Sequence, residues 1–387
     1  MHIAIAAPLD ARRLAEELVL VPGDGAMVPQ GHGGHSVTEL VLALAPLVDG
    51  LDLVTLDPRL DHPVDLHGDG VRLAVGPSRD RGRGRDLFAV ERSFIEGQLR
   101  SWRPDAVSAH WTYEYALGAL DAGLPTLVTV RDWAPTILWH ARDAYRAARL
   151  LMQGMVFARG RHFAAVSPYM AGKVHRITRR SVAVLPNAVG PMWLDAPAPQ
   201  PIGVQVVAVN AGFGRRKNVT RLLAAWPSVR EQQDDAELVL VGQGYEVNGV
   251  AYEWARRRGL TEAVRFHGPI DRAELPGLIA SARLLVHPSL EESFGMVILE
   301  AMALGLPVLG GRRSGAVPWL LEDEAGVLVD VRSPAAIADG ISRLLGDKSF
   351  ALQTAARGQQ RARERFSSDA AARAYVDVLT RVGSGGR

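Results

Sequence analysis

Short apolar segments alternate with helical patterns along almost the whole chain of 387 residues. Strands that alternate with helices in this way are typical of α/β proteins with parallel sheets. In the first half of the chain we expect strands at residues 2–7, 51–56, 106–110, 126–129, 163–166 and 182–185. In the second half we expect strands at residues 204–210, 237–241, 264–266, 284–287, 307–310 and 326–329.

The two sets of strands predict two domains, because a chain of this length is too long for one ordinary core. Between the sets, prolines at positions 197, 199 and 201 exclude both a helix and a central strand. We therefore expect a first domain at residues 1–187, a linker at 188–203 and a second domain at 204–360. The segment 361–387 should hold an amphipathic helix from about Arg361 to Leu379.

Each half resembles a doubly wound, Rossmann-like nucleotide-binding unit. Such units bind ligands at the carboxyl ends of their strands. Two units that face each other would form a cleft, so the motifs that follow strands should point into it.

Composition excludes several classes of protein. Hydrophobic residues make up 48% of the chain and charged residues 22%, which is typical of a globular protein. The net charge of +2, without a basic tail, gives no electrostatic support for nucleic-acid binding. The chain has no cysteine, so disulfides and thiolate chemistry are excluded. Neither a signal peptide nor a membrane span is recognisable, and we expect a cytoplasmic protein.

The most informative motif lies between His287 and Leu309. Two glutamates, Glu292 and Glu300, flank the start of a helix predicted from Gly295 to Leu304. The free amides of a helix N-terminus attract anions, whereas carboxylates accept hydrogen bonds from sugar hydroxyls. A phosphate site with hydroxyl acceptors on either side matches the shape of a nucleotide-sugar. Two glutamates at a fixed spacing are also common in ordinary helices, where one complements the dipole and the other is solvated.

The intervening Ser-Phe-Gly-Met and the following Glu-Ala-Met-Ala-x-Gly-x-Pro-Val decide between these interpretations. The whole string resembles the signature of the retaining glycosyltransferases of family 4, which have the two-domain GT-B architecture with a C-terminal helix that crosses back to the N-terminal domain. The resemblance implies that Glu292 contacts the donor sugar and that Glu300 holds the ribose hydroxyls. It also implies that the turn contacts sugar and phosphate through Phe294, Gly295, Met296 and Val297. The family most often has glycine where this chain has Ser293.

A basic loop, Asn210–Asn218, follows the first strand of the second half. Positive charge in this loop would stabilise a departing diphosphate. The resemblance implies this role for Lys217, together with either Arg215 or Arg216, because Gly212 stands where the family has its arginine. The alternative is a solvated basic loop.

Further donor contacts follow from the same resemblance. In the first half, a glycine pair near the donor phosphate corresponds to Gly33 and Gly34. In the second half, the strand end at Gly268 and Ile270 corresponds to backbone that contacts the nucleotide base. Near the glycine pair, His32 and His35 could suggest a metal site, but no third ligand lies in an obvious place.

Candidate acceptor contacts follow two strands of the first half. They are His110, Tyr113, Glu114, Arg131 and Asp132, of which Asp132 is best placed to accept or orient a hydroxyl proton. The family often has histidine at the position of Arg131. This chain lacks that histidine, so Arg131 cannot be given its role directly. A buried charge pair around Arg131 and Asp132 is the structural alternative.

No Asp-x-Asp pair, the usual metal-holding motif of metal-dependent glycosyltransferases, occurs in the chain. We therefore expect a retaining, metal-independent transferase without a cofactor. Its donor should be a hexose-type sugar on UDP or GDP, and its acceptor a small molecule or a glycan. A nucleotide-sugar epimerase or hydrolase, and a non-catalytic nucleotide-sugar-binding partner, are the alternatives.

A membrane surface is an additional candidate partner for residues 79–100. We favour instead that the apolar side chains of this stretch pack into the protein core. The loop Arg79–Arg85 is basic, and the stretch Asp86–Arg100 that follows is amphipathic. Such a combination can bind anionic lipids, although acidic residues in the stretch dilute its charge.

Overall fold

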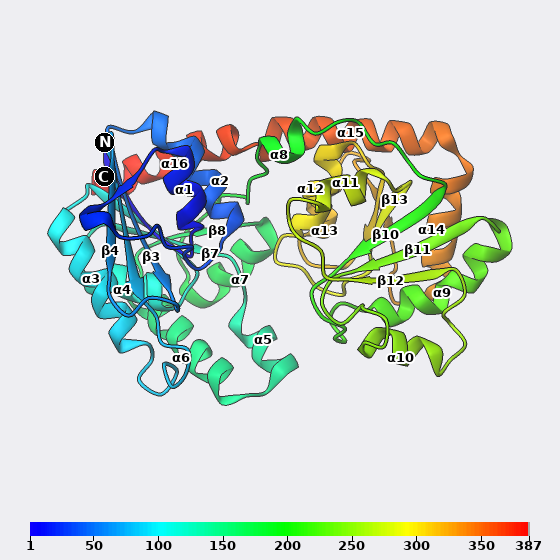
Figure 1. Cartoon of the computed structure of the whole chain (residues 1–387), viewed down its shortest axis with the longest axis horizontal. Helices are drawn as coiled ribbons and strands as arrows, with labels where there is room; N and C mark the ends of the chain where they lie inside the picture. Colours follow the sequence, from blue (N-terminus) through cyan, green and yellow to red (C-terminus); the bar gives the residue numbers. More distant parts are fainter. Residues whose placement is uncertain (386–387) are drawn as a thin grey trace. The chain divides into compact units, whose positions relative to one another are not determined.

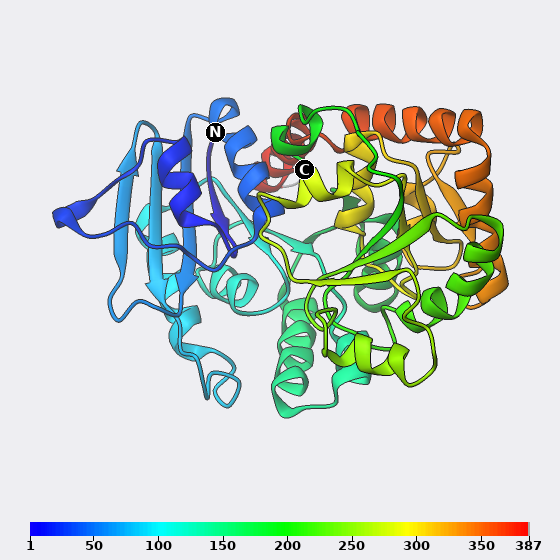
Figure 2. The same cartoon turned by 45° about the vertical axis from the view of Figure 1, so that its right-hand side comes forward.

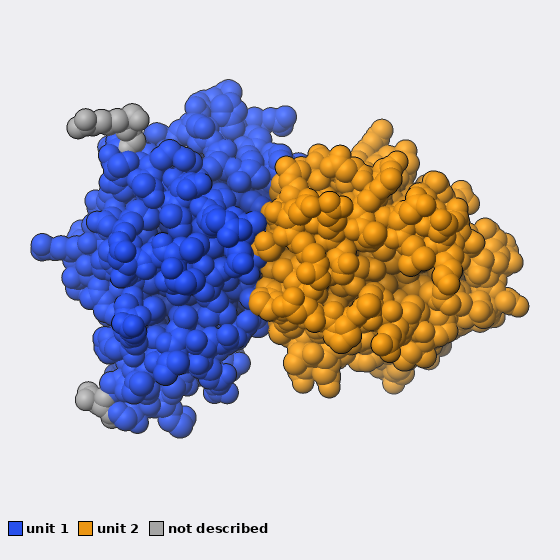
Figure 3. Space-filling view, turned by 90° about the horizontal axis from the view of Figure 1, so that it is seen from above, with its two compact units in different colours: residues 1–188, 368–387 blue, residues 189–367 orange. Residues whose placement is uncertain are grey.

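The computed structural model describes residues 1–385, apart from the side chains of Asp24 and Ala141. The chain divides into two compact units, coloured separately in Figure 3. Unit 1 comprises residues 1–188 and 368–387, and unit 2 comprises residues 189–367. Within the described residues, none of the helices has both the length and the apolar character that crossing a membrane requires.

Unit 1 is built on a nine-stranded sheet. Its strands are β1 (His2–Ala6), β2 (Val21–Pro22), β3 (Gly50–Asp57), β4 (Val64–Gly68), β5 (Val71–Pro77), β6 (Ala106–His110), β7 (Thr126–Val130), β8 (His162–Ala165) and β9 (Val182–Val184). They follow the order β2-β4-β5-β3-β1-β6-β7-β8-β9, in which only β4 runs antiparallel to its neighbours. Figure 2 shows the blue strands of this sheet side by side. The order reverses direction between β1 and β6, which is where a doubly wound sheet binds ligands.

Every strand predicted for the first half of the chain is present, but three further strands, β2, β4 and β5, were not predicted. β4 and β5 form a hairpin whose turn is Asp69-Gly70, with Gly70 at a φ of +67°. An Asp-Gly turn between two strands is a recognised hairpin signal. The hairpin extends the sheet beyond β3 through parallel pairing of β5.

The helices of unit 1 cover this sheet. They are α1 (Ala11–Glu17), α2 (His35–Leu44), α3 (Ala89–Trp102), α4 (Glu114–Asp121), α5 (Ala134–Ala141), α6 (Ala144–Arg159), α7 (Pro168–Thr178) and α16 (Ser368–Gly383), with two short 3₁₀ turns at Gly23–Gly25 and Ala45–Leu47. In α3, the apolar stripe that could suggest a membrane surface packs inward instead, because Ile95 and Leu99 are fully buried.

The C-terminal helix α16 packs against α2 and β6 of unit 1. Figure 1 shows it in red beside the first helices of the chain. Its residues Tyr375 and Leu379 are fully buried in the core of the unit. The prediction that the C-terminal helix crosses back to the N-terminal part of the chain is therefore confirmed.

The predicted start of that helix at Arg361 is wrong. Arg361 lies inside a longer helix of unit 2, α15 (Lys348–Phe366), and α16 begins only at Ser368. The break occurs because Ser367 is extended and forms a bridge with Val189, whose amide also donates to the Phe366 carbonyl at 2.9 Å. A pairing between residues so distant in sequence leaves no local signal.

Unit 2 contains a six-stranded sheet that is parallel throughout. Its strands are β10 (Val204–Val209), β11 (Ala236–Val241), β12 (Val264–Gly268), β13 (Leu284–His287), β14 (Val308–Gly311) and β15 (Val327–Val329). They correspond to the six strands predicted for the second half. The order β12-β11-β10-β13-β14-β15 reverses between β10 and β13. The loops that follow β10 and β13 therefore meet at the position where a doubly wound sheet binds its ligand.

The other helices of unit 2 complete the α/β layers. They are α8 (Pro191–Leu194), α9 (Val219–Gln232), α10 (Val250–Arg256), α11 (Leu275–Ala280), α12 (Met296–Leu304), α13 (Val317–Leu320) and α14 (Pro334–Gly346). The short helix α8 falls within the predicted linker 188–203. It packs against α12 and buries Trp193, so this part of the segment belongs to the second unit.

Leu379→Ala should lower the free energy of unfolding of unit 1 by about 2–5 kcal/mol, because a fully buried leucine loses its apolar contacts and leaves a cavity. Urea unfolding followed by circular dichroism and tryptophan fluorescence measures this change. Leu352→Ala is the matched control, since Leu352 is 60% exposed on α15 and should cost less than about 0.5 kcal/mol. Equal unfolding midpoints for the two variants would contradict the packing of α16.

Candidate active site

The N-terminus of α12 is the centre of the site in unit 2. Gly295 caps this helix with a φ of +108°, a conformation that glycine adopts without strain. At the other end, Gly305 is the predicted stop and has a φ of +77°. Phe294 points into the core, where its ring contacts Trp319 and Phe366 edge-on. The side chain of Phe294 is thus structural, and the turn offers its backbone to a ligand.

Glu292 lies just before this helix and is almost fully buried. Its Oε1 accepts hydrogen bonds from Lys217 Nζ at 2.7 Å and from His287 Nε2 at 3.1 Å. Its Oε2 lies 3.5 Å from Arg216 Nη1. Burial opposes ionisation, but the hydrogen bond from His287 and the charges of Lys217 and Arg216 outweigh it and hold the pKa of Glu292 far below the usual range. Glu292 is therefore a buried carboxylate among cationic groups.

The geometry distinguishes the two arginines of the basic loop. Arg216 donates to the carbonyl of Glu291 at 3.1 Å and reaches Glu292, whereas Arg215 is exposed. Sequence alone left this choice open. Asn218 holds the loop in place through side-chain hydrogen bonds to the carbonyls of Pro288 and Val331, at 3.0 and 2.8 Å.

His287 is a site residue that the sequence analysis did not assign a role. It ends β13, is buried, and its Nδ1 has no hydrogen-bond partner among the described residues. Because Nε2 contacts the ionised Glu292, the proton belongs on Nε2 in the neutral ring. The available signal was a polar residue at the carboxyl end of a buried strand, directly before the glutamate motif.

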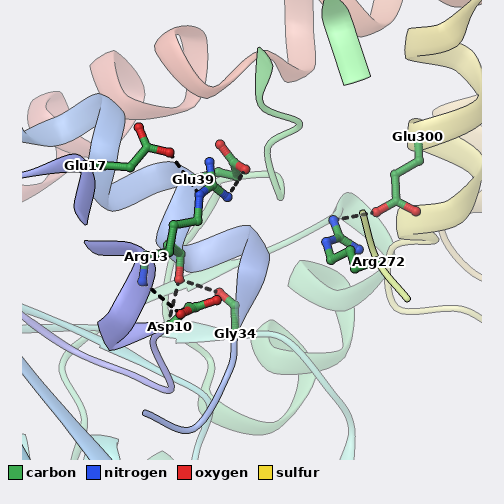
Figure 4. A network of polar contacts seen from close by, with 8 residues as sticks. Asp10, Arg13, Glu17, Gly34, Glu39, Arg272 and Glu300 are labelled. Atoms are coloured by element: carbon green, nitrogen blue, oxygen red, sulfur yellow. Dashed lines mark hydrogen bonds and ion pairs between the residues drawn. The ribbon is translucent and has the colours of Figure 1, made fainter. Parts of the chain in front are cut away.

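Glu300 lies on α12 in a separate cluster of the same unit. Its Oε1 accepts a hydrogen bond from Arg272 Nη2 at 2.9 Å, which Figure 4 shows. Arg272 also lies over the ring of Trp193, with 5.6 Å between the guanidinium carbon and the ring centroid. Burial raises the pKa of Glu300, although the charge and hydrogen bond of Arg272 act in the opposite direction.

The remaining donor candidates of unit 2 lie at the end of β12, in the loop that follows it, and in the first turn of α12. Gly268 ends β12 at a φ of +80°, and its backbone pairs with Tyr245 and Gly242 of the neighbouring loop at 3.0 and 2.8 Å. Ile270, two residues on, is half-buried. Met296 and Val297, the first residues of α12, are half-buried as well.

In unit 1, the glycine pair lies at the N-terminus of α2. Gly34 caps the helix at a φ of +88°, and a Cβ there would come within 2.0 Å of the Pro8 carbonyl oxygen. A Cβ on Gly33 would meet no atom within 4 Å, so this glycine borders open space. A side chain is thus excluded at Gly34 by its contact with Pro8. At Gly33, a ligand could approach the backbone closely.

A polar network joins this turn to α1, as Figure 4 shows. The backbone amide of Asp10 donates to Thr38 Oγ1 at 3.1 Å, and its side chain caps α1. Arg13 of α1 donates to the buried Glu39 of α2 at 2.6 Å. These bonds fix the start of α2 against α1.

Arg131 is buried away from Asp132. Its Nε donates to His110 Nδ1 at 3.0 Å, and its Nη1 donates to Ser36 Oγ at 3.2 Å and to Asn187 Oδ1. Burial and the charge of Arg131 lower the pKa of His110 well below its usual value, so this histidine is neutral. Less than a tenth of either side chain is exposed.

Asp132 belongs to a second cluster with Tyr113. The Tyr113 hydroxyl donates to Asp132 Oδ1 at 2.7 Å, and Arg149 Nη2 lies 3.6 Å from Oδ2. Burial raises the pKa of Asp132, and it also raises the pKa of Glu114 nearby. Two acceptor candidates therefore meet directly, while His110 and Arg131 form a cluster of their own. Within residues 1–385, no group of three histidine or acidic side chains is arranged to hold a metal ion.

Two family models match the chain and together cover most of it. The model "Glycosyl transferases group 1" matches residues 201–365, and the model "Glycosyl transferase 4-like domain" matches residues 33–188. The first match contains Lys217, Glu292 and Glu300, and the second contains the acceptor candidates of unit 1.

Named relatives agree with these models. A "D-inositol 3-phosphate glycosyltransferase" of Corynebacterium urealyticum is 33% identical over 184 residues, which are 46% of this chain and 43% of the relative. A "GDP-mannose-dependent alpha-(1-6)-phosphatidylinositol monomannoside mannosyltransferase" of Mycobacterium tuberculosis is 32% identical over 171 residues, 42% of this chain and 44% of the relative. The chain thus matches less than half the length of these relatives.

The fold also agrees with solved structures. The HepE protein of Anabaena, solved with UDP and glucose, superposes with a TM-score of 0.68 at 18% identity. The superposition covers 98% of this chain and 99% of that one. The chain therefore belongs to glycosyltransferase family 4 and has the GT-B fold.

Proposed function

We propose that the protein transfers a hexose-type sugar from a nucleoside-diphosphate sugar to an acceptor hydroxyl, with retention of configuration and without a metal ion. One observation carries this proposal: the buried Glu292 is held by Lys217 directly before the N-terminus of α12. A carboxylate and a cation next to free helix amides are suited to a sugar and a diphosphate respectively.

The charge balance of this cluster supports an anionic ligand. Lys217 and Arg216 bring two positive charges to the single carboxylate of Glu292. The dipole of α12 adds to this excess. In the proposed reaction, the diphosphate leaves the sugar and its growing charge is stabilised by Lys217, Arg216 and the helix amides.

Both glutamates have an oxygen to offer to the donor. Lys217 and His287 hold Oε1 of Glu292, and Arg272 holds Oε1 of Glu300. Among the described residues, no side chain or amide donates a hydrogen bond to Oε2 of either carboxylate, and Arg216 Nη1, which donates to the Glu291 carbonyl, lies 3.5 Å from Oε2 of Glu292. We propose that Glu292 Oε2 accepts from a sugar hydroxyl and Glu300 Oε2 from the ribose.

The acceptor side of the reaction is assigned to unit 1. We propose that Tyr113, Glu114 and Asp132 contact the acceptor, with Asp132 orienting its hydroxyl. The bond between the anomeric carbon and the phosphate oxygen breaks while the acceptor oxygen bonds to the same face. The departing phosphate takes the proton of that hydroxyl.

The names of similar proteins guide the choice of donor. One relative is named as GDP-mannose-dependent, and one similar structure was solved with UDP and glucose. We propose UDP or GDP as the carrier. A thermal-shift screen of the full chain with UDP, GDP, ADP and TDP tests this choice, because a ligand that binds only the folded state raises the unfolding temperature.

Product analysis with the preferred donor tests the reaction itself. Proton NMR of the product's anomeric signal should show the configuration of the donor, and activity should persist in EDTA. An inverted product would contradict retention, and loss of activity in EDTA would contradict metal independence. Release of free or epimerised sugar at the full rate without an acceptor would instead favour an epimerase or a hydrolase.

Lys217→Ala should reduce kcat by about 10²–10³-fold, because a preorganised charge next to the leaving group is lost. Steady-state kinetics with the preferred donor measure the effect. Lys348→Ala is a matched control, since Lys348 is exposed at the start of α15 and should leave kcat unchanged. If the Lys217 variant kept kcat within twofold of the wild type, the leaving-group site would be wrong.

Glu300→Gln should weaken nucleotide binding about 10–100-fold, because hydrogen bonds to a charged group contribute roughly 1.5–3 kcal/mol. Isothermal titration with UDP or GDP measures the dissociation constant. Glu364→Gln, an exposed position on α15, serves as control. Unaltered nucleotide affinity in the Glu300 variant, with its unfolding temperature preserved, would remove Glu300 from the ribose site.

A further inference from the structure

Unit 1 has a pocket at the edge of its sheet opposite the acceptor candidates. The pocket has a volume of about 450 Å³ and lies where β7, β8 and β9 begin, beside the last turns of α16. The acceptor candidates His110 and Arg131 lie instead where β6 and β7 end. A ligand in this pocket is therefore distinct from the acceptor.

The buried residues that line the pocket are apolar. They are Leu127 of β7, Phe163 of β8 and Val382 of α16. The half-buried Ala183 and Val378 lie beside them. Together these side chains form an apolar floor that can cover a ring or a short hydrocarbon part of a ligand.

Three arginines form the rim of the pocket. Arg161 directly precedes β8, Arg180 lies between α7 and β9, and Arg381 lies in the last turn of α16. All three are exposed, and none of the residues that line the pocket is acidic. Because the three arginines come from separate segments, the fold brings their charges together at one place.

The protein itself does not use the three guanidinium groups of the rim. Among the described residues, none of the three accompanies a hydrogen-bond acceptor, an acidic partner or an aromatic ring. Asp377 precedes Arg381 by four residues on α16, a spacing at which ion pairs form, but Asp377 is exposed and no ion pair joins the two. Each guanidinium therefore keeps its five N–H donors for a ligand.

Two of these charges act on the same histidine. His162 begins β8 and lines the pocket. Burial, followed by the charges of Arg161 and Arg180, lowers the pKa of His162. Cations that act on one residue also repel each other, and an anion between them would relieve this repulsion.

Two helix C-termini near the pocket oppose an anion, but the arginines outweigh them. α7 ends shortly before Arg180, and α16 ends at Gly383. Each helix C-terminus carries about half a negative charge, so the two ends together bring roughly one. Against the positive charges of the three rim arginines, an excess of about two positive charges remains.

We propose that this pocket binds a phosphorylated small molecule. Arg161, Arg180 and Arg381 hold the phosphate, and the rest of the ligand lies on the apolar floor. Guanidinium groups match phosphate through paired N–H donors, and a phosphate group brings about two negative charges, which equals the excess at the rim. The volume of the pocket also suits a small molecule, since such sites typically enclose about 300–1,000 Å³.

The ligand would connect α16 to the strands of unit 1. Tyr375, on the same helix as Val382, donates to Thr129 Oγ1 at 3.3 Å and stacks on His110. Leu127 of the pocket floor lies on the same strand as Thr129. A phosphate bound between Arg381 and the arginines before β8 and β9 therefore stabilises the packing of α16.

Isothermal titration of the full chain with phenyl phosphate, inorganic phosphate and phenol tests the proposal. Phenyl phosphate should bind about tenfold or more tightly than phenol, which lacks the anion. It should bind about threefold or more tightly than inorganic phosphate, which lacks a ring for the apolar floor. Equal affinity for phenyl phosphate and phenol, or no saturable binding of phenyl phosphate at about 10 mM, would overturn the proposal.

Variants locate the ligand in the pocket. Arg180→Gln and Arg381→Gln should each reduce the affinity for phenyl phosphate about fivefold or more, because each removes a charge and its paired donors. Both side chains are exposed, so the unfolding temperature should be preserved. Arg373→Gln is the matched control, since Arg373 is exposed on the same helix and does not line the pocket. Wild-type affinity in both pocket variants, or an equal loss in the control, would contradict the proposed site.

Hydrogen exchange gives a second readout of position. Saturating phenyl phosphate should slow amide exchange about threefold or more in peptides that cover residues 161–163, 181–183 and 378–382. Slower exchange confined to unit 2 would show that the anion binds elsewhere.

Lys217→Ala separates this pocket from the donor site of unit 2. The variant should keep the wild-type affinity for phenyl phosphate. If it lost that affinity while the Arg180 and Arg381 variants retained it, the anion would bind at the donor site and the pocket assignment would be wrong. Nucleotide titration of the same samples tests the proposed function separately, because the pocket and the donor site lie in different units.

Discussion

The buried ion pair between Glu292 and Lys217 is the interaction on which the site of unit 2 depends. It joins the loop after β10 to the loop after β13, the two strands between which the sheet order reverses. A buried carboxylate is costly unless it is paired, and removal of one partner of such a pair typically costs about 3–5 kcal/mol. Lys217 and His287 donate hydrogen bonds to Oε1 and Arg216 lies 3.5 Å from Oε2, so the three groups meet this requirement together. The same contacts that stabilise the loops thus shape the place where we propose that the donor sugar binds.

In unit 1 too, buried polar side chains hold the loops at the point where the sheet order reverses. The strand order of this sheet reverses between β1 and β6. The cation of Arg131 is stabilised by the neutral acceptors His110, Ser36 and Asn187. Tyr375 of α16 stacks on His110 with 5.7 Å between ring centroids, so the end of the chain supports this cluster. Arg131 therefore holds the loop structure, and the more accessible Arg149 lies over Tyr113 and beside Asp132.

Much of this fold was predictable from local patterns, because buried parallel strands are short apolar runs and each of the twelve predicted strands is present. The hairpin β4–β5 was missed although Asp69-Gly70 marks its turn, since its strands mix charged and apolar residues and resemble a loop. The break between α15 and α16 could not be predicted, because it arises from the pairing of Ser367 with Val189. The burial of Trp193, which lies on α8, could not be predicted either, because α8 packs against α12, which is distant in sequence.

The sequence by itself determined the α/β class, the presence of two nucleotide-binding-like halves, and the pattern of Glu292, Glu300 and Lys217 that identifies the family. These features are local, because they depend only on which residues occur at which spacing within one strand–helix connection. The tertiary structure alone decided that Arg216 reaches Glu292 while Arg215 faces outward, that His287 completes the cluster, and that Arg131 turns away from Asp132. Side-chain direction depends on which elements pack around a loop, and those elements come from remote parts of the chain. Arg149 shows this most clearly, because nothing near it in sequence indicates that α6 brings it to Tyr113 and Asp132.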